Sequence, residues 1–239
     1  MPASNIRKTT RKNFHRYRKG YQIQGRAHVS IPRTTLGPRA MALKLRYNIG
    51  LVAGEGIAFT SSAGGITNQI WTINNPYDLN ASAGGHQPLG FDQYMAIYGL
   101  GVCVSAKCTF DWIFQSANPP THESTVVYSY LSDQITAPTK PQILELPRRS
   151  YAILTGNGKH SRIRQVTKVD MKKFFNQSKI QGHTEYQFSD SVASFKKCYL
   201  HTGGYCVSTP LESSDFRLVG TIDCDVILYQ LRRPAQSII

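Results

Sequence analysis

A long run of alternating residues is the feature that most constrains the fold. From Val102 to Phe114 the sequence reads VCVSAKCTFDWIF, and every second residue is apolar. Successive side chains of a β-strand point to opposite faces, so the run predicts a long strand with one buried face. The predicted buried side chains are Val102, Val104, Ala106, Cys108, Phe110, Trp112 and Phe114, and the polar ones are Cys103, Ser105, Lys107, Thr109 and Asp111.

The same period recurs in two other segments. Residues 41–49 are apolar at the odd positions, whereas Ala42, Lys44, Arg46 and Asn48 are small or polar. Residues 218–229 place Thr221, Asp223, Asp225 and Tyr229 opposite an apolar face. Both segments therefore predict half-buried strands. Weaker strand signals, rich in β-branched and aromatic residues, lie at Ile66–Ile73, Thr125–Leu131, Ile163–Val169, Lys197–Thr202 and Tyr205–Ser208.

Helical signals are few and short. Asp92 is a candidate cap for QYMAIY, with Gly99 as a left-handed end, and residues 169–177 predict a further turn of helix. About eight strands with long, varied connections favour an all-β fold, a single eight-stranded antiparallel jelly-roll sandwich, over a meander barrel.

Positive charge is concentrated at the N-terminus. The net charge is +14, and twelve Lys or Arg occur from Arg7 to Arg46 before the first acidic residue, Glu55. Residues 47–239 hold sixteen cations against fourteen acids. Residues 1–39 show no apolar period, so we expect a basic, flexible arm at 1–39 and a nearly neutral jelly-roll body at 40–239.

The arm interleaves cations with aromatic rings. Cations neutralise phosphates and rings stack on unpaired bases, so this mixture suits single-stranded nucleic acid bound without reading its sequence. A nuclear-localisation signal and a solubilising tail are alternatives, and the first is compatible with binding. The expected nucleic-acid-binding residues are Arg7, Lys8, Arg11, Lys12, Phe14, Arg16, Tyr17, Arg18, Lys19, Tyr21, Arg26, Arg33 and Arg39, followed by Lys44 and Arg46 on the polar side of their strand.

Signals for other classes of protein are weak. No apolar run is long enough for a signal peptide or a membrane span, and five cysteines are too few and odd in number for a disulfide framework, so reduced, buried thiols are expected. LTGNGKHS lacks the first glycine of a phosphate-binding loop and has His160 where Ser or Thr is needed, so Asn157-Gly158 is better explained as a tight turn.

Metal and catalytic motifs are also poorly matched. Cys198, His201 and Cys206 lack a fourth zinc ligand, and Asp223 with Asp225 is more often solvated or paired with cations than bound to calcium. No nucleophile or metal-helix motif is present. We therefore expect no enzyme, no catalytic residue, no metal and no cofactor.

The stretch GGHQPLGFDQY, residues 84–94, places a histidine and an aspartate six positions apart among glycines. One His and one Asp in a loop give no sign of convergence or of shifted acidity, so a structural loop is the better interpretation. A buried hydrogen-bonding role is expected for His86, and a pH-sensitive interface contact is the alternative. The predicted loop motif is Gly85, His86, Gln87, Pro88, Gly90, Phe91 and Asp92.

Residues 74–112 carry a family likeness. NNPYDLNASAGGHQPLGFDQYMAIYGLGVCVSAKCTFDW resembles the segment that joins two jelly-roll strands in capsid proteins of circular Rep-encoding single-stranded DNA viruses, the circovirus-like group. The resemblance implies a capsid subunit of the virion that self-assembles into a small icosahedral shell of about 60 copies (T=1), packages circular single-stranded DNA through its basic arm, and enters the nucleus of a eukaryotic host. It implies no membrane partner, and the host receptor is not identified.

Three other classes of protein are alternatives. One is a cellular module that binds nucleic acid without sequence preference through a β-barrel body and a basic tail. Another is a capsid protein of a small RNA virus, because nothing in the arm reads a 2′-hydroxyl. The third is a jelly-roll enzyme or lectin, which would need a lined pocket with convergent histidines and carboxylates.

Overall fold

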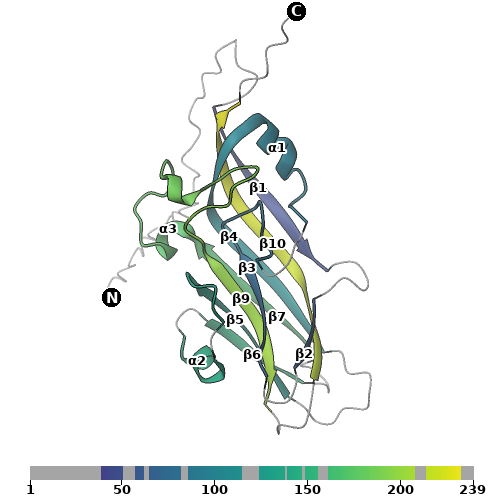
Figure 1. Cartoon of the computed structure of the whole chain (residues 1–239). Coiled ribbons are helices and arrows are strands. Elements are labelled where there is room, and N and C mark those ends of the chain that lie inside the picture. Colours follow the sequence, from purple (N-terminus) through teal and green to yellow (C-terminus); the bar gives the residue numbers. More distant parts are fainter. Residues whose placement is uncertain are drawn as a thin grey trace, which may run out of the picture.

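Two stacked antiparallel sheets make up the body. The computed structural model describes residues 39–50, 57–61, 65–81, 86–114, 124–137, 139–146, 149–155, 161–207 and 214–232. One sheet has the order β1 (Ala40–Ile49), β10 (Ser214–Leu231), β4 (Tyr98–Phe114), β7 (Arg162–Asp170), and the other β3 (Thr67–Thr72), β9 (Tyr199–Cys206), β5 (Ser124–Ser132), β6 (Arg149–Thr155) (Figure 1). Two short strands extend the first sheet, β2 (Ile57–Ser61) beside β10 and β8 (Gln187–Phe188) beside β4.

The strand order is that of a jelly roll. If the eight main strands are numbered along the chain, one sheet reads 1-8-3-6 and the other 2-7-4-5, with every neighbouring pair antiparallel. The first and last strands therefore lie side by side, as two nested Greek keys require. The predicted fold class, an all-β jelly-roll sandwich, is confirmed.

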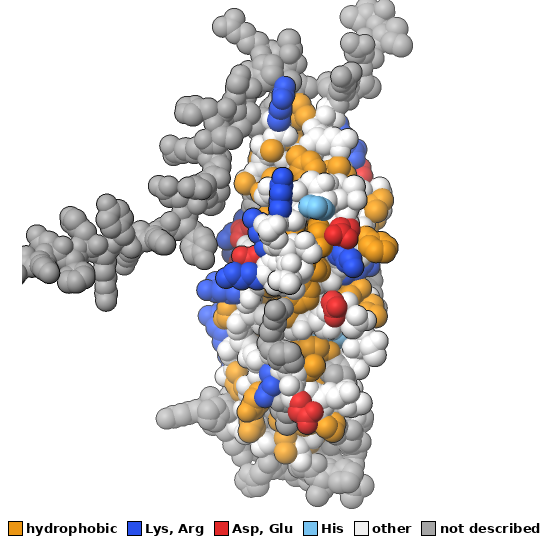
Figure 2. All heavy atoms as spheres, turned by 90° about the vertical axis from the view of Figure 1, so that its left-hand side faces the viewer, with side chains coloured by type: hydrophobic (Ala, Val, Ile, Leu, Met, Phe, Trp, Pro, Cys, Tyr) orange, Lys and Arg blue, Asp and Glu red, His pale blue; other side chains and the backbone are white. Residues whose placement is uncertain are grey.

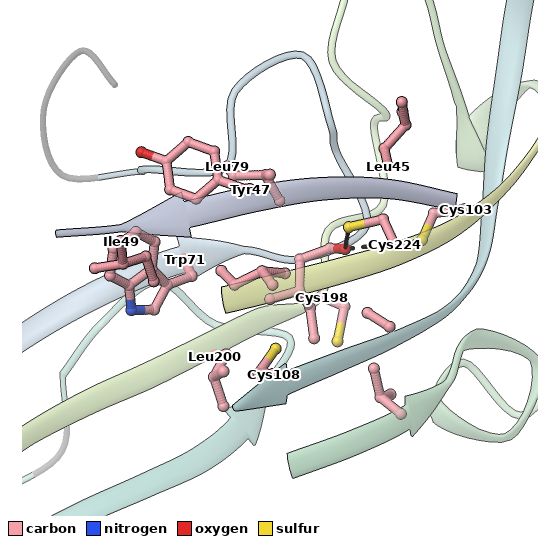
Figure 3. Packing of buried hydrophobic residues seen from close by; sticks show 14 of the residues in the cluster. Leu45, Tyr47, Ile49, Trp71, Leu79, Cys103, Cys108, Cys198, Leu200 and Cys224 are labelled. Atoms are coloured by element: carbon pink, nitrogen blue, oxygen red, sulfur yellow. Dashed lines mark hydrogen bonds between the residues drawn. The ribbon is translucent and has the colours of Figure 1, made fainter. Parts of the chain in front are cut away.

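The core fills the space between the sheets. Trp71 and Trp112 are almost wholly buried, and their indole N–H groups donate to Thr202 and Gln165, both over 2.9 Å. Buried indoles need such partners, so the two tryptophans also fix the register of neighbouring strands. Figure 3 shows the packing around the thiols of this cluster: Cys103, Cys108, Cys198 and Cys224 lie among Leu45, Tyr47, Trp71 and Leu200.

Alternation in the first sheet agrees with the sequence pattern over most of its length. In β4, Ala106, Cys108, Phe110 and Trp112 are buried as expected. Near the start of β4 the pattern fails, because Cys103 is also buried and Val104 is only half-buried. A bulge in the pairing with β10, between Asp225 and Val226, shifts the register at this point.

A single strand, β9, replaces the two strands expected at 197–202 and 205–208. Gly203 and Gly204 lie within it rather than in a turn, so that prediction is wrong. A β-carbon on Gly203 would lie 1.9 Å from the Thr67 carbonyl oxygen, and one on Gly204 would lie 2.7 Å from the Phe216 ring. These glycines are present because neighbouring atoms occupy the space of a side chain.

Three short α-helices accompany the strands of the described residues. The expected turn of helix is α3 (Met171–Phe174), and the Asp170 carboxylate accepts from the backbone N–H groups of Lys172 and Lys173 at its start. The helix α2 (Lys140–Glu145) was not predicted; Thr139 and Gln142 cap it in a reciprocal box. No helix in the described ranges is long and apolar enough to span a bilayer.

Candidate nucleic-acid interface

The outer face of the β1-β10-β4-β7 sheet is rich in charge, and we call it the charged face. The pairing of the strands aligns the side chains of this face in rows across the sheet. One such row crosses β1, β10, β4 and β7 in turn, and its members are Arg46, Asp223, Lys107 and Lys168. These residues occupy the polar positions of strands whose other side packs into the core, so their placement follows from the period of two. The charged face includes Lys44, Arg46, Lys107, Asp111, Arg162, Arg164, Lys168, Asp170, Arg217, Asp223 and Asp225.

Lys44 and Arg46 project from β1 onto this face, as expected. The Arg46 guanidinium donates to both carboxylate oxygens of Asp223, over 2.6 and 3.1 Å, and these hydrogen bonds raise the pKa of Arg46. The Lys44 amine lies 3.6 Å from an oxygen of Asp225, which also accepts from the Ser105 hydroxyl over 2.7 Å. A phosphate at either cation would therefore compete with an aspartate.

Two arginines of β7 share one carboxylate. Arg162 Nη2 and Arg164 Nε lie 3.2 and 3.3 Å from the two oxygens of Asp111. About two thirds of each arginine side chain is exposed, whereas Asp111 is nearly buried. One negative charge offsets two positive ones, so this edge of the sheet keeps an excess of positive charge.

Four lysines complete a cationic edge. Lys107 and Lys168 are exposed on neighbouring strands, and Lys172 and Lys173 are exposed on α3, which follows β7 directly. Within the described ranges no carboxylate lies within ion-pair distance of these four amines. Viewed from the side on which α3 lies in Figure 1, Lys and Arg side chains gather along the left-hand flank of the molecule (Figure 2). These amines are the cations of the face most available to an anionic ligand.

Most of the predicted arm contacts fall on residues 1–38, which are outside the described residues. Arg39 is exposed at the entry to β1, and β1 is an edge strand of the sheet that carries the charged face. The described residues therefore bring together Arg39, Lys44 and Arg46 from the predicted set and leave the rest of it untested.

The loop before α1 (Phe91–Ile97) is structural, although two details differ from expectation. The helix begins two residues earlier than predicted: Gly90 precedes it with a φ of +85°, and no side chain caps it, so Asp92 is not the cap. With its amide oriented to donate, Gln87 lies 2.6 and 3.1 Å from the two Asp92 oxygens. The helix ends at Tyr98, whose backbone is extended, so the expected left-handed Gly99 is also wrong.

His86 is exposed, which corrects the expected buried role. Its ring stacks on the buried ring of Tyr47 with centroids 4.3 Å apart and planes 11° apart. Pro88 and Phe91 are the buried members of the loop, and Gly85 lies outside the described residues. The His86–Asp92 pair thus separates into two independent structural contacts.

The weak metal candidates have other partners. His201 is buried, and its Nε2 lies 2.9 Å from the Gln134 carbonyl oxygen. Because a carbonyl oxygen can only accept a hydrogen bond, Nε2 carries the proton. The other ring nitrogen, Nδ1, then accepts from the Asn68 amide 3.1 Å away. Both ring nitrogens are therefore engaged. Asp223 and Asp225 form the ion pairs described above, and the described residues contain no cluster of metal-ligating side chains.

Sequence reasoning missed the edge formed by Lys107, Lys168, Lys172 and Lys173. Each is polar in a predicted strand or turn, but their proximity depends on the pairing of β4 with β7, between residues about 60 positions apart. The only available signal was the shared polar phase of the two strands.

Comparisons with known proteins give structural similarities only. No family model and no curated sequence matches the chain. A structure of tobacco necrosis virus is 16% identical and covers 87% of this chain and 90% of its own, with a TM-score of 0.47. A structure of mud crab tombus-like virus is 10% identical and covers 99% of this chain and 96% of its own, with a TM-score of 0.46. A structure of turnip yellow mosaic virus is 11% identical and covers 84% of this chain and 99% of its own, with a TM-score of 0.44. The jelly roll is established by the strand order, independently of these similarities.

Proposed function

We propose that the chain is a viral capsid (coat) protein, whose copies assemble into a closed shell around a single-stranded nucleic acid genome. The observation that carries the proposal is the place where the described body begins. Arg39 leads into β1, an edge strand of the sheet that bears the charged face, so the basic N-terminal sequence joins the body at this edge. Arm and charged face can therefore contact one polyanion on the same side of the subunit, which becomes the inner side of the shell.

The resemblance of residues 74–112 supports a finer proposal. It favours a circular single-stranded DNA genome, an icosahedral shell of about 60 copies, and passage through the nucleus of a eukaryotic host directed by the same arm. Binding is electrostatic and needs no base reading, because the cations of the arm and face serve any phosphate backbone. The mechanism is binding and assembly, without turnover.

The test compares the full chain with a version that starts at Ala40. Both are expressed, inspected by electron microscopy, and treated with nuclease before the protected nucleic acid is extracted. We expect shells from the full chain, with protected nucleic acid that falls several-fold in the shortened version. Digestion of the extract by DNase or by RNase identifies the genome type.

Two outcomes would overturn parts of the proposal. Monomers at every salt concentration and pH would favour the cellular nucleic-acid-binding module over the capsid. Equal protection by the two versions would exclude a packaging role for the arm.

A further inference from the structure

Among the exposed apolar side chains of the described residues, two groups form surfaces that are complementary in size and charge. The first, the α1 knob, consists of Leu89, Tyr94 and Ile97, which are 95%, 36% and 47% exposed. The second is a groove of about 1400 Å³ between the end of β5, α3 and residues 191–199, which we call the Phe195 groove. Its apolar lining includes Leu131, Phe174, Phe175, Val192, Phe195 and Tyr199.

The knob is held firmly despite its exposure. Phe91 and Met95 anchor α1 in the core, at 1% exposure each. The Gln87–Asp92 contact fixes the preceding loop, and the Ile97 carbonyl accepts from the backbone N–H of Arg232 over 2.8 Å. A fixed apolar surface costs little conformational entropy on binding, which suits it to a specific contact.

The rim of the groove is held equally well. The buried side chain of Asn74 donates to the Lys196 carbonyl over 2.8 Å and accepts from the Cys198 backbone N–H over 2.8 Å. The Lys196 N–H in turn donates to the Glu185 carbonyl over 2.8 Å. Phe195 nevertheless remains 82% exposed on this fixed rim. Large aromatic side chains on a rigid rim are typical of interface centres.

Size and charge point to the occupant. The groove is larger than the 300–1000 Å³ usual for small-molecule sites. A seven-residue helix such as α1 is about 10 Å long and about 11 Å across, and so fills about 1000 Å³. The knob carries the exposed carboxylate of Asp92, and the groove carries the two cations Lys196 and Lys197 against one carboxylate, Asp133.

We infer that the α1 knob of one copy docks in the Phe195 groove of a second copy. The inference rests on the proposed self-assembly and names the surfaces that mediate one of its contacts. Leu89 and Ile97 enter the groove beside Phe195, and Asp92 faces the lysines of the rim. The contact joins two different surfaces and is therefore heterologous: each copy can place its knob in one neighbour and receive the knob of another in its groove.

Complementation tests the contact directly. One full-length variant loses the knob (Leu89→Asp with Ile97→Asp), and another loses the groove surface (Val192→Asp with Phe195→Asp). Sedimentation velocity in high salt, after nuclease treatment, gives the association constant of each. We expect each variant alone to associate at least about 30-fold more weakly than the wild type, as for loss of an interface hot spot. Their equimolar mixture should form heterodimers, because the first keeps its groove and the second keeps its knob.

Controls separate this contact from the function that it serves. Val166→Asp places a charge at an apolar residue of the charged face that is 46% exposed, close to the 47% of Ile97, and should leave association unchanged. Circular dichroism and thermal melts verify that the variants fold, as expected for exposed positions. If the wild type and both variants form shells equally well, the contact is wrong and the capsid proposal stands. A mixture that stays monomeric also overturns the contact, and a wild type that never associates overturns both.

Discussion

The outer faces of the two sheets differ in kind. The β1-β10-β4-β7 sheet exposes Lys and Arg side chains on its outer side, where Asp111 and Asp223 are buried beneath the arginines that pair with them. The β3-β9-β5-β6 sheet is buried on both sides over much of its length, because a second apolar cluster of Val126, Tyr128, Tyr130, Ile143 and Tyr205 lies on its outer side. Every residue of β9 is buried. The same fold thus leaves one sheet open to a charged ligand and encloses the other.

The enclosed sheet tolerates no added volume, and its most sensitive position is Gly203. We expect Gly203→Ala to lower the free energy of unfolding by more than about 3 kcal/mol, or to prevent folding, because the added methyl group would overlap the Thr67 carbonyl. Urea unfolding followed by fluorescence measures the change. Gly99→Ala is the matched control, since the nearest atom to its β-carbon would be 3.4 Å away. Equal stability of the two variants would show that β3 can move away from β9.

The contrast between the sheets also explains what the sequence could predict. Strands with one face exposed to water alternate between polar and apolar residues, so β1, β4 and β10 were predicted from their period of two. β7 was predicted close to its true bounds from its β-branched residues. A strand buried on both faces shows no period of two, so β9 was divided at Gly203. β6 was missed for a different reason: its exposed positions include the apolar residues Tyr151 and Ile153, so its sequence does not alternate between polar and apolar residues. The candidate site divided similarly: the positions of Lys44 and Arg46 followed from alternation, whereas their pairing with Asp225 and Asp223 depends on a register set by segments about 180 residues apart.

The α2 helix maintains the enclosure, and Ile143 is its buried contact. Ile143→Ala removes a side chain with no exposed surface, and we expect it to cost about 3 kcal/mol of folding free energy. Ile153→Ala on β6, where the side chain is 51% exposed, should change stability by less than about 0.5 kcal/mol. Denaturant midpoints of the two variants test the difference. A small effect of Ile143→Ala would mean that the outer cluster is dispensable.

His201 gives the enclosed sheet a pH dependence. Burial lowers the pKa of His201, so between about pH 6.5 and that lowered value only the unfolded chain takes up the proton. Stability is complete above pH 6.5 and falls as the pH decreases, by at most about 1.4 kcal/mol per pH unit. Urea midpoints from pH 7.5 to 5 should decline in the wild type and decline less in His201→Gln. Parallel curves for the two proteins would assign the dependence to other groups.

The open sheet should respond to charge rather than to packing. We expect Lys168→Gln to leave stability nearly unchanged and to reduce by about 0.7 the slope of log affinity for single-stranded DNA against log salt, as for loss of one phosphate contact. Lys179→Gln, at an exposed lysine away from the sheets, is the control. Fluorescence anisotropy across a salt series measures both. Identical slopes for the two variants would remove β7 from the interface.

Because the thiols are buried, their reaction with an alkylating agent measures local opening of the fold. All five cysteines are buried, and they are spread over β4, β9 and β10 and the residue before β9. A hydrogen bond to Cys224, together with burial, raises the pKa of the Cys103 thiol, and burial raises that of Cys108, so both stay protonated and unreactive in the folded state. Pulsed alkylation read by mass spectrometry would therefore modify each cysteine only when its own strand separates. In an assembled particle, the order in which the five are modified would trace the route by which a subunit comes apart.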